Sequence, residues 1–210
     1  MLWDLDGTLI DSRAYHWRSW AEVLLAEGVV LTEQEFEKSF GQRNDTILAE
    51  WLGADAAPER VRRIGDAKEV RYRGLVETEG IAALPGAADW VRSLHAAGWR
   101  QAIASSAPRQ NVRVVERALA FAGLIEAVVG AEDVRAGKPD PEVFLTAAHR
   151  LGVAPHRCVV VEDAAAGIEA ARRAGMRSIG VGGTALSGAD VLVASLVELG
   201  RDIFDGLVGR

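Results

Sequence analysis

The chain has 210 residues, 49% of them hydrophobic and 26% charged, which excludes disordered and fibrous proteins and fits one large domain or one domain that carries an insertion. Its net charge of -6 provides no basic surface, so we predict neither a nucleic acid nor a membrane partner. Cys158 is the single cysteine, and no apolar run approaches the roughly 18 residues of a membrane span, so we expect a cytoplasmic protein without a disulfide, a membrane helix or a signal peptide.

The first predicted element is a short strand at residues 2–5, and two acids lie at its carboxyl end. Residues two apart in an extended segment share a face, so Asp4 and Asp6 can both point into the crevice where open α/β sheets bind ligands. Two carboxylates there suit Mg²⁺ and offer a nucleophile beside an acid/base. A surface Asp-Gly turn is the alternative, whereas a calcium loop is excluded because its required Gly and Glu are replaced by Leu9 and Tyr15.

The next stretch is helical in pattern and contains no plausible strand. Glycines at positions 28, 41 and 53 interrupt it. Because the opening strand precedes this stretch and further strands follow it, we predict a helical insertion at residues 14–80. The sheet-bearing domain would then consist of residues 1–13 and 81–210.

From residue 85 onward, short apolar runs alternate with amphipathic stretches, a pattern typical of βα units that feed a parallel sheet. The predicted strands lie at residues 101–105, 127–129, 158–162, 178–181 and 191–193. The predicted helices lie at residues 87–97, 109–121, 141–151 and 165–174, and each of them is followed closely by a glycine or a turn. The fold class is therefore α/β, with a doubly wound parallel sheet and an all-helical insertion.

Hydroxyl and lysine side chains follow two of these strands. Ser105 and Ser106 stand at a strand end ahead of a predicted helix, where hydroxyls and free backbone amides make an anion site, although serine is also a common capping residue. Lys138 precedes Pro139, which disfavours helical dihedral angles at Lys138 and lets its side chain reach a phosphate. A solvated loop lysine is the alternative.

A second acid pair, Glu162 and Asp163, ends the apolar strand at residues 158–162. Carboxylates at such a place cost desolvation free energy unless a cation or a donor compensates, which favours a metal site over a helix-capping role for Asp163. The order along the chain is an acid pair, a hydroxyl, a lysine and an acid pair, each at a strand end or in the following loop. Such a set predicts phosphoryl transfer.

The whole chain resembles the haloacid dehalogenase-like superfamily of phosphotransferases, in particular the branch that contains β-phosphoglucomutase and small sugar phosphatases. The family's four motifs are matched by Asp4-Leu-Asp6-Gly-Thr, Ser105, Lys138-Pro139 and Glu162-Asp163. This resemblance implies a Rossmann-like core with the helical insertion as a cap over the active site.

The resemblance also implies a role for each motif residue. Asp4 would take the phosphoryl group as an aspartyl phosphate, and Asp6 would protonate the leaving oxygen and then activate the incoming water or hydroxyl group. The groups around Mg²⁺ would be the Asp4 carboxylate, the Asp6 backbone carbonyl, Asp163 and, close by, Glu162. The groups that hold the transferring phosphate and the adjoining substrate would be Ser105, Lys138 and Ser106.

Three residues of the predicted cap resemble substrate-binding residues of the mutase. His16 stands where that family has a histidine near the acid/base, and Lys68 stands where it has a lysine that partners this histidine. Arg43 resembles the arginine that holds the distal phosphate of the substrate. The alternatives are a helix-face residue for His16 and a solvated loop charge for Arg43.

Three departures from the mutase pattern bear on the activity. Arg43 lies one residue closer to its preceding glycine, the loop after Ser105 has Ala107 and Pro108 where the mutase loop is polar, and only three residues precede Asp4, so we expect a shortened first strand. We therefore favour a Mg²⁺-dependent, monomeric phosphatase that acts on a small phosphorylated metabolite, a sugar phosphate, through an aspartyl phosphate.

Two other activities are weighed against this hypothesis. A β-phosphoglucomutase that interconverts β-glucose 1-phosphate and glucose 6-phosphate is the alternative enzyme, supported by His16, Arg43 and Lys68 together. A phospho-accepting signalling receiver is a remote alternative, because it would carry its adjacent acid pair at the first strand and would have no cap.

Overall fold

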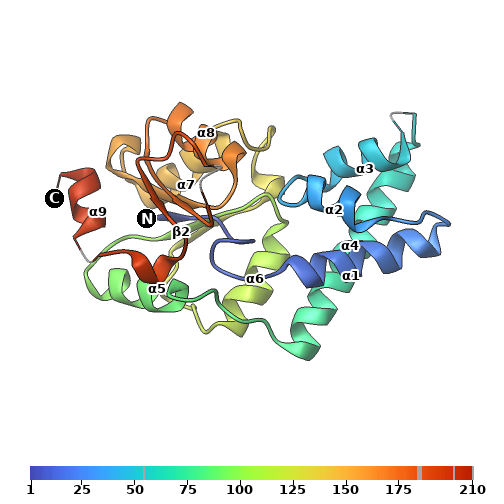
Figure 1. Ribbon diagram of the computed structural model, residues 1–210, viewed down its shortest axis with the longest axis horizontal. Coiled ribbons are helices and arrows are strands. Elements are labelled where there is room, and N and C mark those ends of the chain that lie inside the picture. Colours follow the sequence, from blue (N-terminus) through green and yellow to red (C-terminus); the bar gives the residue numbers. More distant parts are fainter. Residues whose placement is uncertain (54, 184–185, 201, 210) are drawn as a thin grey trace.

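The computed structural model describes residues 1–53, 55–183, 186–200 and 202–209. These residues form an α/β part and a helical part (Figure 1). Two connecting segments, residues 4–12 and 80–86, join the two parts and lie side by side, because Ile10 and Ala83 form an antiparallel bridge. Any movement of one part relative to the other would therefore bend these two paired segments together.

Six parallel strands form one sheet in the order β3-β2-β1-β4-β5-β6. The strands are β1 (Leu2–Trp3), β2 (Ala102–Ala104), β3 (Ala127–Val129), β4 (Val159–Glu162), β5 (Arg177–Val181) and β6 (Val191–Val193). The chain starts at the centre of the sheet, builds outward through β2 and β3, and returns to the other side of β1 with β4. A crevice for ligands forms where the strand order reverses in this way. The topology confirms the predicted doubly wound α/β class.

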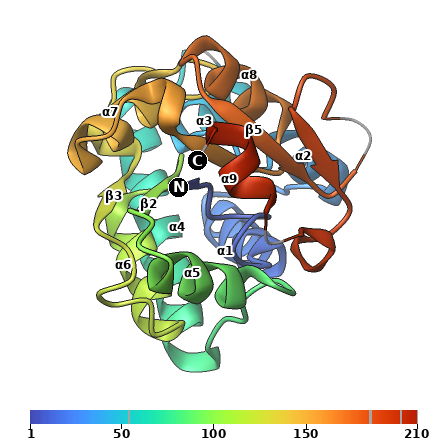
Figure 2. The same ribbon diagram turned by 90° about the vertical axis from the view of Figure 1, so that its left-hand side faces the viewer.

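Helices cover both faces of the sheet, as Figure 2 shows. One face carries α5 (Ala87–Ala96), α6 (Arg109–Ala118) and α9 (Ile203–Val208), and the other carries α7 (Glu142–Leu151) and α8 (Ala165–Arg173). Successive strand residues point to opposite faces, so Trp3 is buried in the first apolar cluster and its neighbour Leu2 in the second. Short 3₁₀ helices occupy Ala131–Asp133, Pro155–Arg157 and Leu196–Glu198.

Most predicted elements lie within one residue of their observed ends, whereas β1, β2 and α6 are shorter than the predicted ranges by two or three residues. Helix α6 ends at Ala118 and not at residue 121, because Ala120 adopts a left-handed conformation with φ of 54° and the helix cannot continue through it. Strand β1 contains only Leu2 and Trp3, although the amide of Asp4 still donates a 3.0 Å hydrogen bond to the Val161 carbonyl of β4. Asp4 is thus held at the end of the sheet by backbone pairing.

Among the described residues between β1 and α5, four helices form the cap. They are α1 (Arg13–Ala26), α2 (Glu33–Ser39), α3 (Asn44–Leu52) and α4 (Pro58–Glu79). Their shared core is an apolar cluster that includes Trp20, Leu24, Phe36 and Leu48. We propose residues 14–80 as the cap domain, with residues 1–13 and 81–210 as the core, on the basis of this separate cluster. No helix in the described ranges is long and apolar enough to cross a membrane.

Packing of α7 against the sheet provides a test of the core. Leu151 of α7 is 1% exposed and belongs to the second apolar cluster, whereas Leu145 of the same helix is 39% exposed. Truncation of a buried leucine removes its contacts and leaves a cavity, so we expect Leu151→Ala to lower the free energy of unfolding by about 2–5 kcal/mol. Urea unfolding would measure the change, and Leu145→Ala is the matched control. Equal losses in the two variants would contradict this packing.

Candidate active site between the core and the cap

Three carboxylates meet where β1 and β4 end side by side. Asp4 follows β1, Glu162 is the last residue of β4, and Asp163 comes next. One oxygen atom from each lies within 4.8 Å of the others. Oxygen ligands from carboxylates are those that a hard divalent cation prefers, so this cluster is able to hold a metal ion.

Lys138 joins this cluster from a loop of the core. Its Nζ atom lies 2.5 Å from Oδ1 of Asp4 and 2.7 Å from Oε2 of Glu162, and all three side chains are less than 10% exposed. The peptide bond between Lys138 and Pro139 is cis. A single ammonium group therefore faces three carboxylates, and the remaining negative charge matches that of a site for a divalent cation.

The pKa values in the cluster follow from burial and charge. Burial raises the pKa of Asp4 well above its usual value, the charge of Glu162 adds to this rise, and Lys138 opposes it. Burial and the charge of Glu162 also raise the pKa of Asp163 to about 7. Burial by itself would lower the pKa of Lys138, but the two carboxylates beside it outweigh burial and hold that pKa above its ordinary value. The site is thus short of positive charge as it stands.

Two glycines make room for these carboxylates. A Cβ atom built on Gly7 would lie 2.0 Å from Oδ2 of Asp163, and one built on Gly167 would lie 2.0 Å from Oε2 of Glu162. Gly7 also has φ of 88°, a left-handed conformation that disfavours other residues. Neither role is predictable from the sequence, because Gly7 has the pattern of a turn residue and Gly167 that of an ordinary helical residue.

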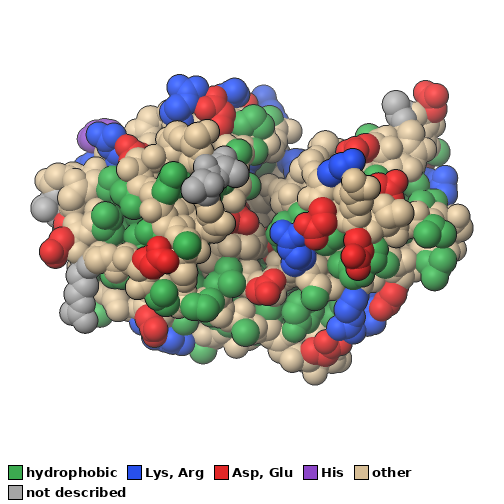
Figure 3. Space-filling model, viewed as in Figure 1, with side chains coloured by type: hydrophobic (Ala, Val, Ile, Leu, Met, Phe, Trp, Pro, Cys, Tyr) green, Lys and Arg blue, Asp and Glu red, His purple; other side chains and the backbone are tan. Residues whose placement is uncertain are grey.

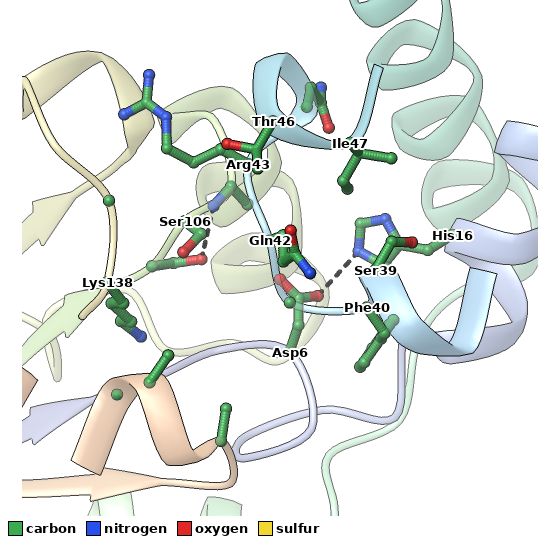
Figure 4. A pocket seen from close by; sticks show the side chains of 18 of the residues that line it. Asp6, His16, Ser39, Phe40, Gln42, Arg43, Thr46, Ile47, Ser106 and Lys138 are labelled. Atoms are coloured by element: carbon green, nitrogen blue, oxygen red, sulfur yellow. Dashed lines mark hydrogen bonds and ion pairs between the residues drawn. The ribbon is translucent and has the colours of Figure 1, made fainter. Parts of the chain in front are cut away.

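Asp6 lies beside the cluster and is held by one residue of the connecting segment and one of the cap. The Ser12 hydroxyl donates a 2.5 Å hydrogen bond to Oδ1 of Asp6, and Nε2 of His16 lies 3.1 Å from the same oxygen (Figure 4). Burial would raise the pKa of Asp6, but His16 and Ser12 outweigh burial and the pKa lies below its ordinary value. The His16 ring stacks on Tyr72 of α4 with 4.3 Å between ring centroids. Asp6 is therefore an ionised carboxylate of fixed orientation.

Ser105 and Ser106 follow β2 on the other side of the cluster. The Ser105 side chain is 2% exposed, and its hydroxyl oxygen accepts a 3.0 Å hydrogen bond from the amide of Ala107. Ser105 therefore stabilises the turn that follows β2, as a capping serine would, and it also lines the site. Ser106 also lines the cavity, on the side where Lys138 lies (Figure 4).

The cap contributes two cations whose charges are already paired. Nζ of Lys68 lies 2.8 Å from Oε1 of Glu69, and both side chains are less than 10% exposed. The Arg43 guanidinium group donates a 3.0 Å hydrogen bond to the Ala131 carbonyl of the core and also contacts Asp45. Figure 4 shows that Arg43 extends away from Asp6, toward the rim of the site.

A cavity of about 460 Å³ lies between the core and the cap, within the usual size of small-molecule sites. Figure 3 shows the corresponding hollow between the two parts of the surface. The cavity brings together every predicted site residue, namely Asp4, Asp6, His16, Arg43, Lys68, Ser105, Ser106, Lys138, Glu162 and Asp163. Their proposed roles stay predictions. Sequence reasoning missed the polar cap residues of the lining, which are Ser39, Gln42, Asn44, Thr46 and Glu69.

The close approach of Gly7 to Asp163 predicts that Gly7→Ala weakens metal binding. The added methyl group would displace the Asp163 carboxylate, and we expect an affinity for Mg²⁺ about 10- to 100-fold lower by isothermal titration calorimetry. Gly74→Ala is the control, because a Cβ atom on Gly74 meets no atom within 4 Å. Unchanged affinity in Gly7→Ala would rule out Asp163 as a ligand.

Protonation of Asp163 should make the stability of the metal-free protein depend on pH. The pKa of this carboxyl is about 7 in the folded chain and about 4 in an unfolded one, so between these values only the folded state keeps the proton. The free energy of unfolding is then expected to fall as the pH rises from about 4 to about 7 and to stay at the lower value above about pH 7. We expect Asp163→Asn to lack this contribution, a difference on the order of 2 kcal/mol between about pH 5 and about pH 8.

Urea unfolding in the presence of a chelator would measure this difference. Mg²⁺ should suppress it, because a bound cation stabilises the ionised carboxyl. Identical pH dependence in Asp163→Asn and the unaltered protein would show that Asp163 does not hold a proton in the folded state near neutral pH.

Comparison with known proteins agrees with this geometry. A family model described as haloacid dehalogenase-like hydrolase matches residues 1–175. Hexitol phosphatase A of Escherichia coli is 36% identical, with 94% of this chain and 91% of that protein covered, and β-phosphoglucomutase of Bacillus subtilis is 30% identical, with 95% and 90% covered. The crystal structure of CbbY from Rhodobacter sphaeroides in complex with xylulose 1,5-bisphosphate superposes with a TM-score of 0.87 at 30% identity and covers 95% of each chain. The chain therefore belongs to the haloacid dehalogenase-like hydrolases, as an enzyme that hydrolyses or transfers phosphoric monoesters.

Proposed function

We propose that this enzyme is a Mg²⁺-dependent phosphatase that hydrolyses the monophosphate of a small, neutral, polyhydroxylated metabolite, such as a sugar or sugar alcohol phosphate. The observation that carries the proposal is the uneven distribution of charge in the cavity. At the core end the carboxylates of Asp4, Glu162 and Asp163 outnumber Lys138. At the cap end Arg43 and Lys68 are paired with carboxylates, and uncharged amide and hydroxyl side chains line much of the remaining wall. One phosphate at the core end and a neutral body at the cap end fit this arrangement.

In this proposal, Asp4 is the nucleophile. An oxygen of its carboxylate forms the new bond to phosphorus while the bond between phosphorus and the ester oxygen breaks. Lys138, 2.5 Å from the Asp4 carboxylate, is placed to screen the negative charges of the carboxylate and the phosphate from each other. The product of this step is an aspartyl phosphate on Asp4.

Asp6 is the proposed acid/base. It would donate a proton to the leaving ester oxygen and later take a proton from the water that attacks the phosphorus and releases Asp4. Ser12 and His16 fix the orientation of its carboxylate, and the negative charge of an incoming phosphate would raise the pKa of Asp6 and favour the protonated form that the first step needs.

The proposed ligands of the metal ion are the carboxylates of Asp4 and Asp163, the backbone carbonyl of Asp6 and, close by, Glu162. Mg²⁺ would neutralise part of the charge of the transferring phosphate when bound. The raised pKa of Asp163 supports this assignment, because it shows that the cluster has too little positive charge to stabilise the ionised carboxyl, and a cation would supply that charge.

The cap end supports a neutral substrate body. Gln42 points into the cavity above Asp6 (Figure 4), and Thr46 adds a hydroxyl group beside apolar surface from Phe36 and Ile47. A sugar offers hydroxyl groups to such side chains and carbon-bound hydrogens to the apolar ones. The name of the relative hexitol phosphatase A points to the same class of substrate.

A phosphomutase is the second candidate. The contact between His16 and Asp6 and the 30% identity to β-phosphoglucomutase favour it. A mutase has to hold a sugar bisphosphate and keep water away from the aspartyl phosphate, and the paired charges of Arg43 and Lys68 weigh against that.

Phosphorus NMR separates the two candidates. The enzyme would be incubated with Mg²⁺ and, in turn, with sorbitol 6-phosphate, fructose 1-phosphate, and β-glucose 1-phosphate plus a trace of glucose 1,6-bisphosphate. We expect inorganic phosphate to appear with at least one polyol or sugar monophosphate. Growth of glucose 6-phosphate without inorganic phosphate would instead establish the mutase.

Asp4→Asn tests the nucleophile in the same assay. The amide is a poor nucleophile, so we expect loss of phosphate release by several orders of magnitude with little change in melting temperature. Asp89→Asn, at an exposed aspartate of α5, is the matched control and should keep full activity. Activity retained in Asp4→Asn would refute the assignment.

A further inference from the structure

A buried ion pair lies at the cap end of the cavity. Lys68 and Glu69 are neighbours on α4, and both line the cavity while being 2% and 5% exposed. Nζ of Lys68 lies 2.8 Å from Oε1 of Glu69 and also 5.1 Å from the centroid of the Trp20 ring and 5.7 Å from that of Tyr72. The ammonium group is thus enclosed by one carboxylate and two aromatic faces.

Glu69 is fixed in place from both parts of the molecule. Its Oε1 atom also accepts a 2.7 Å hydrogen bond from the Asn44 amide of the cap, and its Oε2 atom accepts a hydrogen bond from the Asn111 amide of the core. Arg73 in turn donates a 3.0 Å hydrogen bond to the side-chain carbonyl of Asn111. Burial would raise the pKa of Glu69, but Lys68 and the other partners outweigh burial, so this pKa is lowered and Glu69 is ionised.

Every other lysine and arginine among the described residues that line the cavity also contacts a carboxylate. Lys138 contacts Asp4 and Glu162, and Arg43 contacts Asp45. A second phosphate on a substrate would therefore meet no unpaired Lys or Arg side chain at the cap end, and it would approach the carboxylate of Glu69. In a partly buried site, such a contact between like charges is strongly unfavourable.

We propose that Glu69, held by Asn111 of the core, is a specificity-determining residue that neutralises Lys68 and restricts the cavity to substrates with one phosphate group. The proposal rests on the function proposed above, and it makes one side chain responsible for the preference for monophosphates. The selectivity works by repulsion, because Glu69 rejects the bisphosphate and adds no attraction for the monophosphate.

Binding of two sugars that differ only in a second phosphate tests this role. Fructose 1-phosphate and fructose 1,6-bisphosphate would be titrated by calorimetry, with Mg²⁺, into the Asp4→Asn enzyme, which cannot turn them over. Glu69→Gln in the same background keeps the size of the side chain but removes its charge. We expect this change to raise the affinity for the bisphosphate relative to the monophosphate about tenfold, because Lys68 becomes free to pair with the second phosphate.

Two further variants separate specificity from structure. Glu50→Gln removes an exposed carboxylate of α3, and the ratio of the two affinities should stay unchanged. Lys68→Met added to Glu69→Gln should abolish the gain for the bisphosphate, because the freed cation is its cause. An unchanged ratio in Glu69→Gln, or a gain that survives Lys68→Met, would overturn the proposal.

The fold and the proposed function are checked separately. Circular dichroism would show whether Glu69→Gln is folded. If it is not, Glu69→Asp takes its place, because this change withdraws the carboxylate from Lys68 by one methylene group. We expect Glu69→Asp to raise the affinity for the bisphosphate relative to the monophosphate by a smaller amount, and no rise would overturn the proposal. Because binding needs no turnover, the affinity ratio is measured even if the phosphatase assay fails. Failure of that assay with an increased ratio would refute hydrolysis alone.

Discussion

The candidate active site depends on one electrostatic constraint, which is that three carboxylates share a buried space with Lys138. Asp4, Glu162 and Asp163 are brought together because β1 and β4 are neighbours at the point where the strand order reverses. Lys138 balances only part of their charge, and the positions of Gly7 and Gly167 allow the carboxylates to approach so closely. Apolar burial of the surrounding sheet supplies the stability that such a concentration of like charge removes.

The cap reaches this site through polar contacts on two sides of the cavity. Arg43 bridges to the Ala131 carbonyl at the rim, and its side chain occupies space that a Cβ atom on Gly137, beside Lys138, would need. Glu69 bridges to Asn111 at the opposite helix pair, where α4 packs on α6. The same side chains therefore join the two parts and set the charge at the cap end.

The core motifs could be predicted from sequence because they are local. An apolar run that stops at an acid or a hydroxyl marks a strand end, and parallel strands place such ends together whatever the details of packing. The partner of Glu69 could not be predicted in this way, since Asn111 lies 42 residues away and meets it only through the placement of the cap on the core. The direction of Arg43 likewise depends on that placement. The role of Gly167 required the position of the Glu162 carboxylate, which no sequence pattern specifies.

The bridges from Arg43 and Glu69 to the core also bear on how long an aspartyl phosphate survives. In the proposed mechanism, substrate would enter and product would leave when the two parts separate, and each separation would break the hydrogen bonds to Ala131 and Asn111. A closed state that opens quickly would lose the alcohol product and admit water, which would complete hydrolysis. A closed state that persists would let the alcohol reorient in place and take the phosphoryl group back on another hydroxyl. In this proposal hydrolysis and isomerisation would compete for one intermediate, and the lifetime of the two contacts would set the ratio of their products.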